Sequence, residues 1–281
     1  MLCLLLVSMA CQSEKETPSG LKYSVIKAGT GKAPAPGELL VFNFQLRDNK
    51  DSIWANSYSE GIPAVIQKQD TSQLKGADGL TEMLQALVPG DSVKTSMSIP
   101  DFFFKLLRRP VPPSVDTTGT VTYFIHVNEV MTMDKFQTWR EDRVKQRDEQ
   151  TIVKYLADNK IEAKQDTSGI YSVFYTSNST GPKPTADNCV EVRYQGKLMK
   201  DGREFDKNDR ISFSLQQVIP GWRLGIPMLA KGDSATFFIP SRLAYGPGGY
   251  PGAIPPDAVL IFNVKLFDFK NTFDPQTRTC K

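Results

Sequence analysis

The sequence predicts an α+β fold in which two antiparallel sheets each curl over one short helix, with a longer helix joining them. Three observations support this prediction. The 281 residues suffice for two domains with separate hydrophobic cores. Several runs alternate apolar and polar residues, which is typical of strands with one buried face. A set of short motifs also occurs twice in the same order, which indicates a duplicated domain.

The repeated motifs keep their order and part of their spacing. Gly79 precedes Gly90 by eleven residues, and Gly221 precedes Gly232 by the same interval. The other pairs are Tyr23–Val25 with Tyr171–Val173, Leu40–Phe44 with Val190–Tyr194, Ile99–Pro100 with Ile239–Pro240, and Val121–Val130 with Val259–Phe269.

These patterns divide the chain into six predicted segments. Between the two halves, apolar residues recur every three to four positions among many charged ones, which predicts a helix with an exposed charged middle. A solvated linker helix is favoured, and a dimerising helix is the alternative. The predicted segments are a leader at 1–10, a polar tether at 11–20, a first domain at 21–131, the connecting helix at 132–163, a second domain at 164–272 and a C-terminal tail at 273–281.

The charge of the chain argues against a nucleic-acid partner. The 34 Lys and Arg residues nearly balance 31 Asp and Glu residues, for a net charge of +3, and both signs are spread along the chain. Binding to a phosphate backbone requires a concentrated basic stripe, which the sequence lacks. We therefore expect a soluble, globular body without nucleic acid.

The N-terminus resembles a bacterial lipoprotein signal. An apolar run, Leu2–Ala10, ends at Cys11 and is followed by polar residues, so the resemblance implies cleavage before Cys11 and acylation of that residue. It predicts a protein of the bacterial cell envelope, lipid-anchored to a membrane and facing the periplasm or the cell surface. No basic residue precedes the run, which a start codon upstream of Met1 would explain. The alternatives are an apolar N-terminus without targeting meaning and a cytoplasmic chain.

Two cysteines remain in the predicted mature body, Cys189 and Cys280. An oxidising compartment permits a disulfide between them, and two free thiols are the alternative. Their spacing matches no zinc motif, and the sole histidine, His126, cannot complete a metal cluster or serve a Ser-His-Asp triad in the second half. We expect no metal and no cofactor.

The second half contains six short motifs in the order and near the spacing of one enzyme family. It resembles the FKBP-type peptidylprolyl isomerases over residues 170–269, which implies two FKBP-like domains, the first one degenerate. The motifs are Val192–Gly196, Asp201–Asp206, Val218–Trp222, Ile239–Pro240, Leu243–Gly246 and Ile254–Pro256.

The resemblance assigns roles to individual residues. It implies catalytic contacts from Asp206, Tyr245 and the backbone N–H of Ile219, with Trp222 as the floor beneath the substrate proline. Two positions depart from the common pattern: Ile211 stands where many members have Phe, and Tyr250 where well-studied members have His. The substrate-binding residues that it implies are Tyr194, Phe205, Ile211, Val218, Trp222, Tyr250, Ile254 and Phe262.

By this resemblance the protein is a peptidylprolyl cis-trans isomerase that assists the folding of exported proteins. Its implied partners are proline-containing polypeptides, with tacrolimus-like macrolides as candidate ligands. The alternative is a non-catalytic chaperone or assembly factor that holds clients in the same pocket. Without the family match, the aromatic residues would be interpreted as core residues, and Asp206 would be interpreted as a salt-bridged surface carboxylate.

The first half is predicted to be catalytically silent. Leu80 replaces the tryptophan, and Ile53–Trp54 falls where Phe205–Asp206 would be expected. The run Phe102–Phe104 replaces the tyrosine loop, and it either binds clients or is buried.

Overall fold

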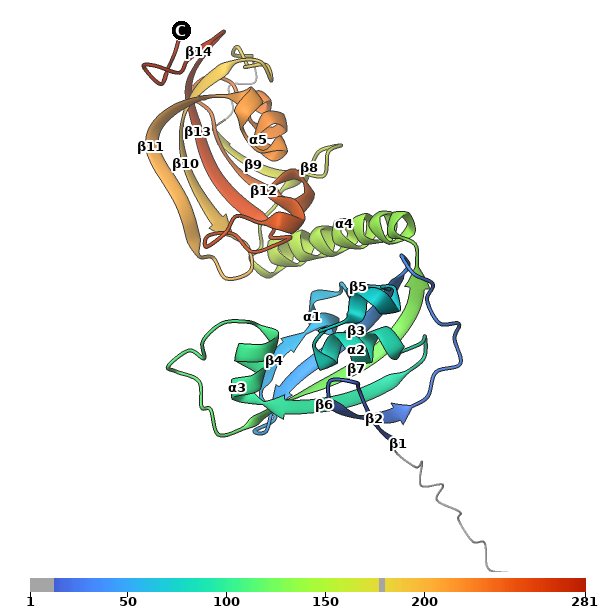
Figure 1. The fold of residues 1–281 in the computed structure, drawn as a ribbon. Coiled ribbons are helices and arrows are strands. Elements are labelled where there is room, and N and C mark those ends of the chain that lie inside the picture. The colour runs from blue at the N-terminus through green and yellow to red at the C-terminus, as the bar shows by residue number, and fades with distance from the viewer. Residues whose placement is uncertain (1–12, 177–179) are drawn as a thin grey trace, which may run out of the picture. The chain divides into compact units, whose positions relative to one another are not determined.

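The computed structural model describes residues 13–176 and 180–281. The predicted leader and the candidate lipidation residue Cys11 lie outside the described residues. The chain divides into two compact units between Glu141 and Asp142, and each unit combines an antiparallel sheet with short helices (Figure 1). The predicted α+β fold class is confirmed. No helix in the described part of the chain is long and apolar enough to cross a membrane.

The N-terminal unit is built on one antiparallel sheet. Its strands are β1 (Ser13–Glu16), β2 (Lys22–Lys27), β3 (Leu39–Asp48), β4 (Ile53–Asn56), β5 (Ala64–Gln67), β6 (Ser92–Ser98) and β7 (Thr120–Met131). Its helical segments are α1 (Ser57–Glu60), η1 (Thr71–Leu74), α2 (Gly79–Ala86), α3 (Ile99–Asp101) and η2 (Phe102–Leu106). The strand order is β1-β2-β6-β7-β3-β4, with β5 paired to β3. Helix α2 buries Met83 and Leu84 against the sheet, and Asp78 caps it by accepting the Thr81 N–H at 2.9 Å.

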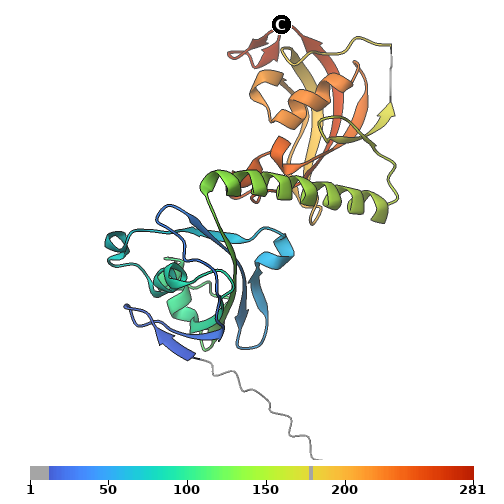
Figure 2. The same ribbon diagram turned by 90° about the vertical axis from the view of Figure 1, so that its right-hand side faces the viewer.

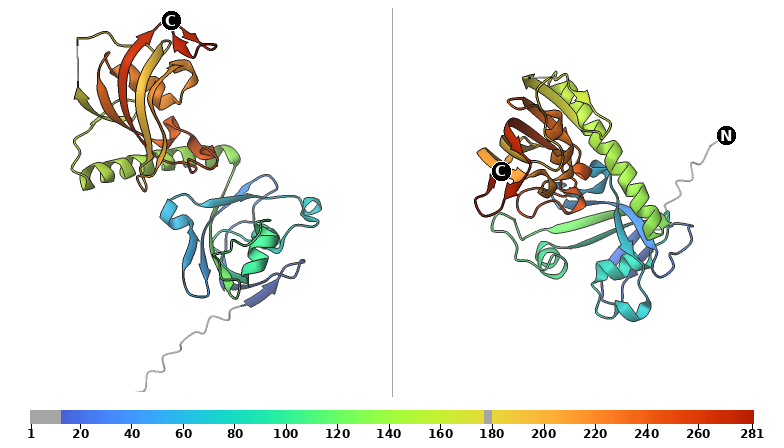
Figure 3. Two further views of the ribbon diagram at one scale, coloured as in Figure 1. Left: turned by 90° about the vertical axis from the view of Figure 1, so that its left-hand side faces the viewer. Right: turned by 90° about the horizontal axis from the view of Figure 1, so that it is seen from above.

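The C-terminal unit repeats this plan. Its strands are β8 (Lys164–Gln165), β9 (Tyr171–Thr176), β10 (Cys189–Leu198), β11 (Glu204–Ser214), β12 (Ser234–Ile239), β13 (Leu260–Lys270), β14 (Phe273–Asp274) and β15 (Thr279–Cys280). Its helical segments are η3 (Leu215–Gln217), α5 (Pro220–Gly225), η4 (Ile226–Met228), η5 (Ser241–Leu243) and η6 (Gly246–Gly248). Figure 2 and Figure 3 show α5 covering one face of the sheet, whose strand order is β11-β10-β13-β12-β9-β8.

The two sheets have equivalent strand orders, which agrees with a duplication. Read from the opposite end, the C-terminal order matches β1-β2-β6-β7-β3-β4 strand for strand. The same turn also precedes β6 and β12: Gly90 and Gly232 adopt φ of 92° and 94°, a region that favours glycine. In each turn the next residue, Asp91 or Asp233, accepts the N–H three residues before it, at 2.8 and 2.9 Å. The units differ in that α1 interrupts the strand equivalent to β11.

A long helix, α4 (Met133–Asp158), contributes to both hydrophobic cores. In its first turns Phe136 and Trp139 stack at 5.8 Å and pack against the N-terminal sheet. Farther along, Ile152 joins the core of the C-terminal unit. The middle of the helix differs from the prediction of an exposed charged surface, because the side chain of Asp148 is fully buried.

Two segments predicted to be irregular contain strands. Ser13–Glu16, in the predicted tether, pairs with β2, and its four side chains are exposed. Backbone pairing needs no apolar side chains, and charges on an edge strand oppose further pairing with other chains. In the predicted tail, β14 pairs with β15. The structure joins Cys280 to Cys189 in a disulfide, so the alternative of two free thiols does not hold.

Candidate functional site

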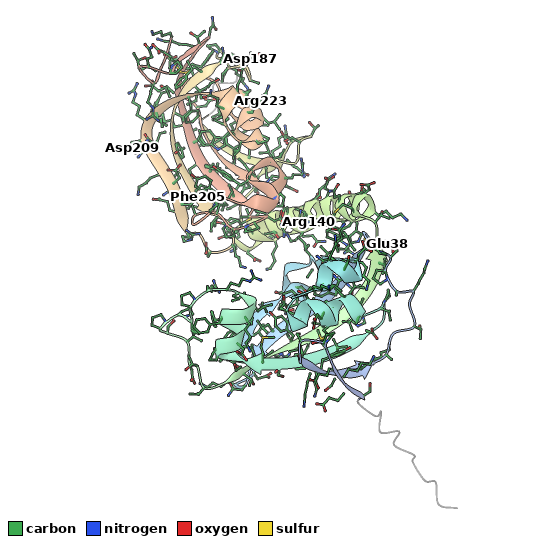
Figure 4. The ribbon with its side chains drawn as sticks, in the orientation of Figure 1. Glu38, Arg140, Asp187, Phe205, Asp209 and Arg223 are labelled. Carbon is green, nitrogen blue, oxygen red and sulfur yellow. A yellow bond between two sulfur atoms is a disulfide. The ribbon has the colours of Figure 1, made fainter. Side chains whose placement is uncertain are left out.

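A pocket of about 270 Å³ lies among β10, β11, β13 and α5 of the C-terminal unit. Phe205, one of its aromatic residues, is labelled on β11 in Figure 4. Eight of the ten lining residues are apolar or aromatic, and Asp206 and Gln217 are polar. The lining residues are Tyr194, Phe205, Asp206, Phe213, Gln217, Val218, Ile219, Trp222, Tyr245 and Phe262.

Trp222 forms the centre of the pocket and is held by three other rings. Its side chain is buried, and the rings of Tyr194 and Phe262 meet it nearly edge-on, with centroids at 5.0 and 5.1 Å. Phe213 lies at 5.2 Å. Edge-to-face contacts satisfy the quadrupoles of aromatic rings and fix their orientation. The indole is therefore a rigid floor, and its buried Nε1–H has no hydrogen-bond partner within the described residues.

Two glycines permit this close packing. A Cβ on Gly196 would stand 2.7 Å from ring atoms of both Phe205 and Phe262. A Cβ on Gly221 would stand 2.5 Å from a methyl carbon of Ile239, so helix α5 could not approach the sheet as closely. Both glycines belong to the motifs that carry the family resemblance, and their part in the site is to leave room for other side chains.

The rim of the pocket carries its polar groups. The hydroxyl of Tyr194 donates a 2.5 Å hydrogen bond to a carboxylate oxygen of Asp206. This bond orients the carboxylate at the edge of the aromatic cluster. No hydrogen bond within residues 13–176 and 180–281 uses the N–H of Ile219. Tyr245 also lines the pocket and is 37% exposed.

The Tyr194 hydroxyl makes the stability of the C-terminal unit sensitive to alkaline pH. Burial, followed by the hydrogen bond to Asp206, raises the pKa of Tyr194 well above its ordinary value of 10.0. The folded chain therefore holds this proton more tightly than the unfolded chain does. The resulting stabilisation is complete below the unfolded pKa and is lost as the pH rises toward the folded pKa.

We expect the urea midpoint of the C-terminal unit to fall more steeply above about pH 10 in the wild type than in Tyr194→Phe. The variant lacks the titrating hydroxyl, whereas other tyrosines that titrate there are common to both proteins. Midpoints measured across the alkaline range test this expectation, and equal slopes for the two proteins would contradict it.

The structure brings together eight of the eleven residues that the resemblance assigned to the site. Ile211, Tyr250 and Ile254 lie outside the pocket. Ile254 is buried in the core around it, and Tyr250 is exposed, with its ring edge-on to Tyr245 at 5.9 Å.

The placement of Ile211 is corrected by the structure. Phe213, two residues farther along β11, is the phenylalanine that contacts Trp222, so the expected aromatic residue is present. Ile211 pairs with Val192 and packs on the core instead. Gln217 also lines the pocket and was missed. The β10–β11 register shifts after Val192, which changes the residues that pair across these two strands. No sequence pattern predicts this shift.

Strand register identifies the equivalent positions in the N-terminal unit. Counted from the shared turn, the pairing places Tyr123 at the position of Phe262, and Leu46 at that of Gly196. Leu46 is buried. Its side chain therefore fills the space that Gly196 leaves open in the C-terminal unit.

The same register corrects the predicted equivalents of Phe205 and Asp206. Leu46 pairs with Ala55 as Gly196 pairs with Asp206, so Ala55, and not Trp54, stands at the position of the acid. Trp54 takes the position of Phe205. The N-terminal unit therefore lacks the rim carboxylate.

The segment after β6 closes the N-terminal unit further. Phe102 and Phe103 are buried and contact Trp54, with ring centroids at 5.8 and 6.2 Å. Phe104 is 61% exposed. The sequence left two alternatives for Phe102–Phe104, client binding or burial. The first two residues are buried, and only the third is exposed to solvent.

The pocket lies within the part of the chain that matches known proteins. A family model described as FKBP-type peptidyl-prolyl cis-trans isomerase matches residues 181–267. FK506-binding protein 1 of Candida glabrata is 45% identical over 89 residues, which cover 30% of this chain and 77% of that protein. The chain belongs to the FKBP family. All ten residues of the pocket lie in the FKBP match.

Two further relatives are longer proteins named FkpA. The probable FKBP-type peptidyl-prolyl cis-trans isomerase FkpA of Neisseria meningitidis serogroup B is 45% identical over 95 residues, 32% of this chain and 35% of that protein. The crystal structure of FkpA from Escherichia coli shares 32% identity and covers 49% of this chain and 65% of that one, with a TM-score of 0.40. The match spans 35% to 53% of the length of the first FkpA relatives. The FKBP match leaves the N-terminal unit uncovered.

Proposed function

We propose that the C-terminal unit catalyses the cis/trans isomerisation of X-Pro peptide bonds and thereby assists the folding of exported proteins. One observation carries this proposal. An apolar pocket with Trp222 at its centre has its polar groups, the Asp206 carboxylate and the Ile219 N–H, at the rim. Such a site suits a proline ring flanked by peptide groups.

The binding mode follows from the positions of these groups. The pyrrolidine ring has no N–H, so it enters the aromatic floor without leaving a buried donor unpaired. The N–H of Ile219 donates to a carbonyl of the bound segment, and the Tyr245 hydroxyl donates to another. The peptide backbone is thus held at its ends, while the X-Pro amide lies over the apolar floor.

The chemistry requires no nucleophile or base. Rotation about the X-Pro bond is opposed by amide resonance, with a barrier of about 18–20 kcal/mol. The twisted amide has lost that resonance and its charge separation, so an apolar site disfavours it less than it disfavours the planar amide. Because the site disfavours the twisted amide less than the planar amide, the barrier between them falls. The uncatalysed step takes roughly tens to hundreds of seconds, long enough to limit folding.

A prolyl peptide assay tests the proposal. The full chain is added to a short peptide with one X-Pro bond, and the relaxation from the cis to the trans isomer is followed. We expect the first-order rate constant to rise in proportion to protein concentration. Identical rates with and without protein would overturn the proposal. A tacrolimus-like macrolide, which we propose as a competing ligand on the strength of the FK506-binding relatives, should suppress the increase.

A second candidate function is client holding without catalysis. The N-terminal unit exposes Phe104, and Ile26, Tyr58 and Phe124 line one shallow site on it. These apolar groups favour contact with unfolded chains. A client protein whose refolding is not limited by proline separates the two functions, because a holding protein suppresses its aggregation while an isomerase alone does not.

We also propose that Cys11 anchors the protein to a bacterial membrane through lipid, in the periplasm or at the cell surface. The apolar run before Cys11 supports this proposal. Cells expressing the wild type should incorporate labelled palmitate into the protein, and Cys11→Ser should not. The wild type should also partition into detergent. Equal labelling of both proteins would contradict acylation at this residue, and Cys189→Ser serves as the control for the choice of cysteine.

A further inference from the structure

Helix α4 contributes a fully buried carboxylate to the C-terminal unit. One oxygen of Asp148 accepts two hydrogen bonds from Ser241, from its N–H at 2.7 Å and from its hydroxyl at 2.5 Å. The other oxygen forms an ion pair with Arg147 at 2.6 Å. A buried charge is tolerated only when partners satisfy it, and the described contacts satisfy both oxygens. Asp148 and Ser241 lie 93 residues apart in the sequence.

The neighbouring residue holds a second point of the same segment. Arg147 donates from its guanidinium to the carbonyl oxygen of Asp257 at 2.8 Å. The N–H of Asp257 in turn donates to the carbonyl oxygen of Gly246 at 2.8 Å. Two adjacent side chains of α4 therefore hold both ends of Ser241–Asp257, which we name the rim segment.

The rim segment carries Tyr245, four residues after Ser241. Within the described residues, Leu243 and Ile254 of this segment pack in the hydrophobic core. Two exposed arginines add hydrogen bonds, from Arg242 to the carbonyl of Ser168 and from Arg203 to that of Ala253. Exposed contacts of this kind contribute little, whereas hydrogen bonds to a buried carboxylate are among the strongest available. Among the polar contacts of the segment, the buried link from Ser241 to Asp148 is therefore the one best suited to fix the position of Tyr245.

We infer that Arg147 and Asp148 of α4 are positioning residues, which hold the rim segment so that Tyr245 stands over the pocket. This inference rests on the proposed isomerase function. It adds to that function a part of the chain outside the family match, because α4 ends at Asp158 and the match begins at residue 181. The site thereby depends on the connecting helix as well as on the FKBP-matched segment.

The main test compares variants of the full chain in the prolyl peptide assay. Asp148→Ala leaves Ser241 unpaired, and we expect kcat/KM to fall about tenfold because a small displacement of a rim group is costly. Asp148→Asn keeps an acceptor for Ser241 and should restore most of the rate. Asp158→Ala removes a similar carboxylate from an exposed i,i+4 pair on the same helix and should leave the rate unchanged.

Two measurements separate positioning from general stability. If Asp148 acts through Tyr245, the double variant Asp148→Ala/Tyr245→Phe should lose little more rate than the more severe of the two single variants. Hydrogen exchange, which does not depend on activity, should show faster amide exchange confined to the rim segment in Asp148→Ala. Melting temperatures identify any variant that fails to fold.

The outcomes distinguish this inference from the proposed function. Losses that multiply in the double variant, or an Asp148→Ala variant with full activity, would overturn the positioning role. Unchanged exchange in the rim segment would also overturn it. A wild-type chain without isomerase activity would instead overturn the proposed function, and the exchange data would then still report whether α4 holds the segment.

Discussion

Replacing Trp222 with leucine should lower kcat/KM for a prolyl peptide about 30-fold, because truncating a buried tryptophan at the centre of a binding site costs roughly 2 kcal/mol. The indole is contacted by Tyr194, Phe213 and Phe262, so its loss removes both the floor and the support for the surrounding rings. Leucine is the residue that the N-terminal unit has at the motif-equivalent position, Leu80. The peptide assay measures the effect directly.

The same experiment tests whether the N-terminal unit is silent. The double variant Trp222→Leu/Asp206→Ala should reduce the rate to that of the uncatalysed reaction, since Ala55 and Leu80 leave the N-terminal unit without the carboxylate and the indole. Trp54→Leu is the matched control, because it removes a tryptophan from the equivalent site and should not change the rate. Residual catalysis in the double variant, together with a loss in Trp54→Leu, would assign activity to the N-terminal unit.

Reduction of the disulfide should destabilise the C-terminal unit by about 4–5 kcal/mol, the chain-entropy expectation for a bond that closes a loop of this size. Cys189 and Cys280 are separated by 91 residues, so the bond encloses most of the C-terminal unit. The disulfide also links the β14–β15 hairpin covalently to the first residue of β10. A urea titration with and without reductant, followed by a signal from the C-terminal unit, measures the change.

The control for this prediction is Cys280→Ala, which keeps the buried Cys189 thiol in the core and should not respond to reductant. Isomerase activity well below the unfolding midpoint should be the same in the oxidised and reduced chains, because neither sulfur lines the pocket. A shift below about 1 kcal/mol would show that the bond constrains only the terminal hairpin rather than the unfolded ensemble of the whole unit.

Much of the site could be predicted because the family motifs combine local structure with function. The run Val218–Trp222 follows η3, begins α5 and supplies the indole in one stretch of sequence. Eight of the assigned residues consequently lie together in the pocket. Ile211 was misplaced because the β10–β11 pairing shifts after Val192, and a shift of this kind changes the neighbours of every later residue.

In the N-terminal unit, too, the equivalent site residues could not be predicted without the strand register. Aligning the motifs along the chain made Trp54 the equivalent of Asp206 in the N-terminal unit. Cross-strand pairing instead makes Ala55 the equivalent residue. Likewise, the run Phe102–Phe104 looks uniform in sequence, yet packing against Trp54 buries two rings and leaves the third exposed. Burial of this kind depends on what lies across the fold.

Periodicity, turn glycines and family motifs are local signals, and they were enough to predict the α+β class, the repeated motifs, the connecting helix and eight of the ten pocket residues. Three contacts could be assigned only from the folded chain: Phe213 with Trp222, Cys189 with Cys280, and Asp148 with Ser241. Each of these joins residues distant along the chain, or depends on strand register. Such contacts are selected by packing and by the need to pair buried polar groups, and both act only once the chain has folded.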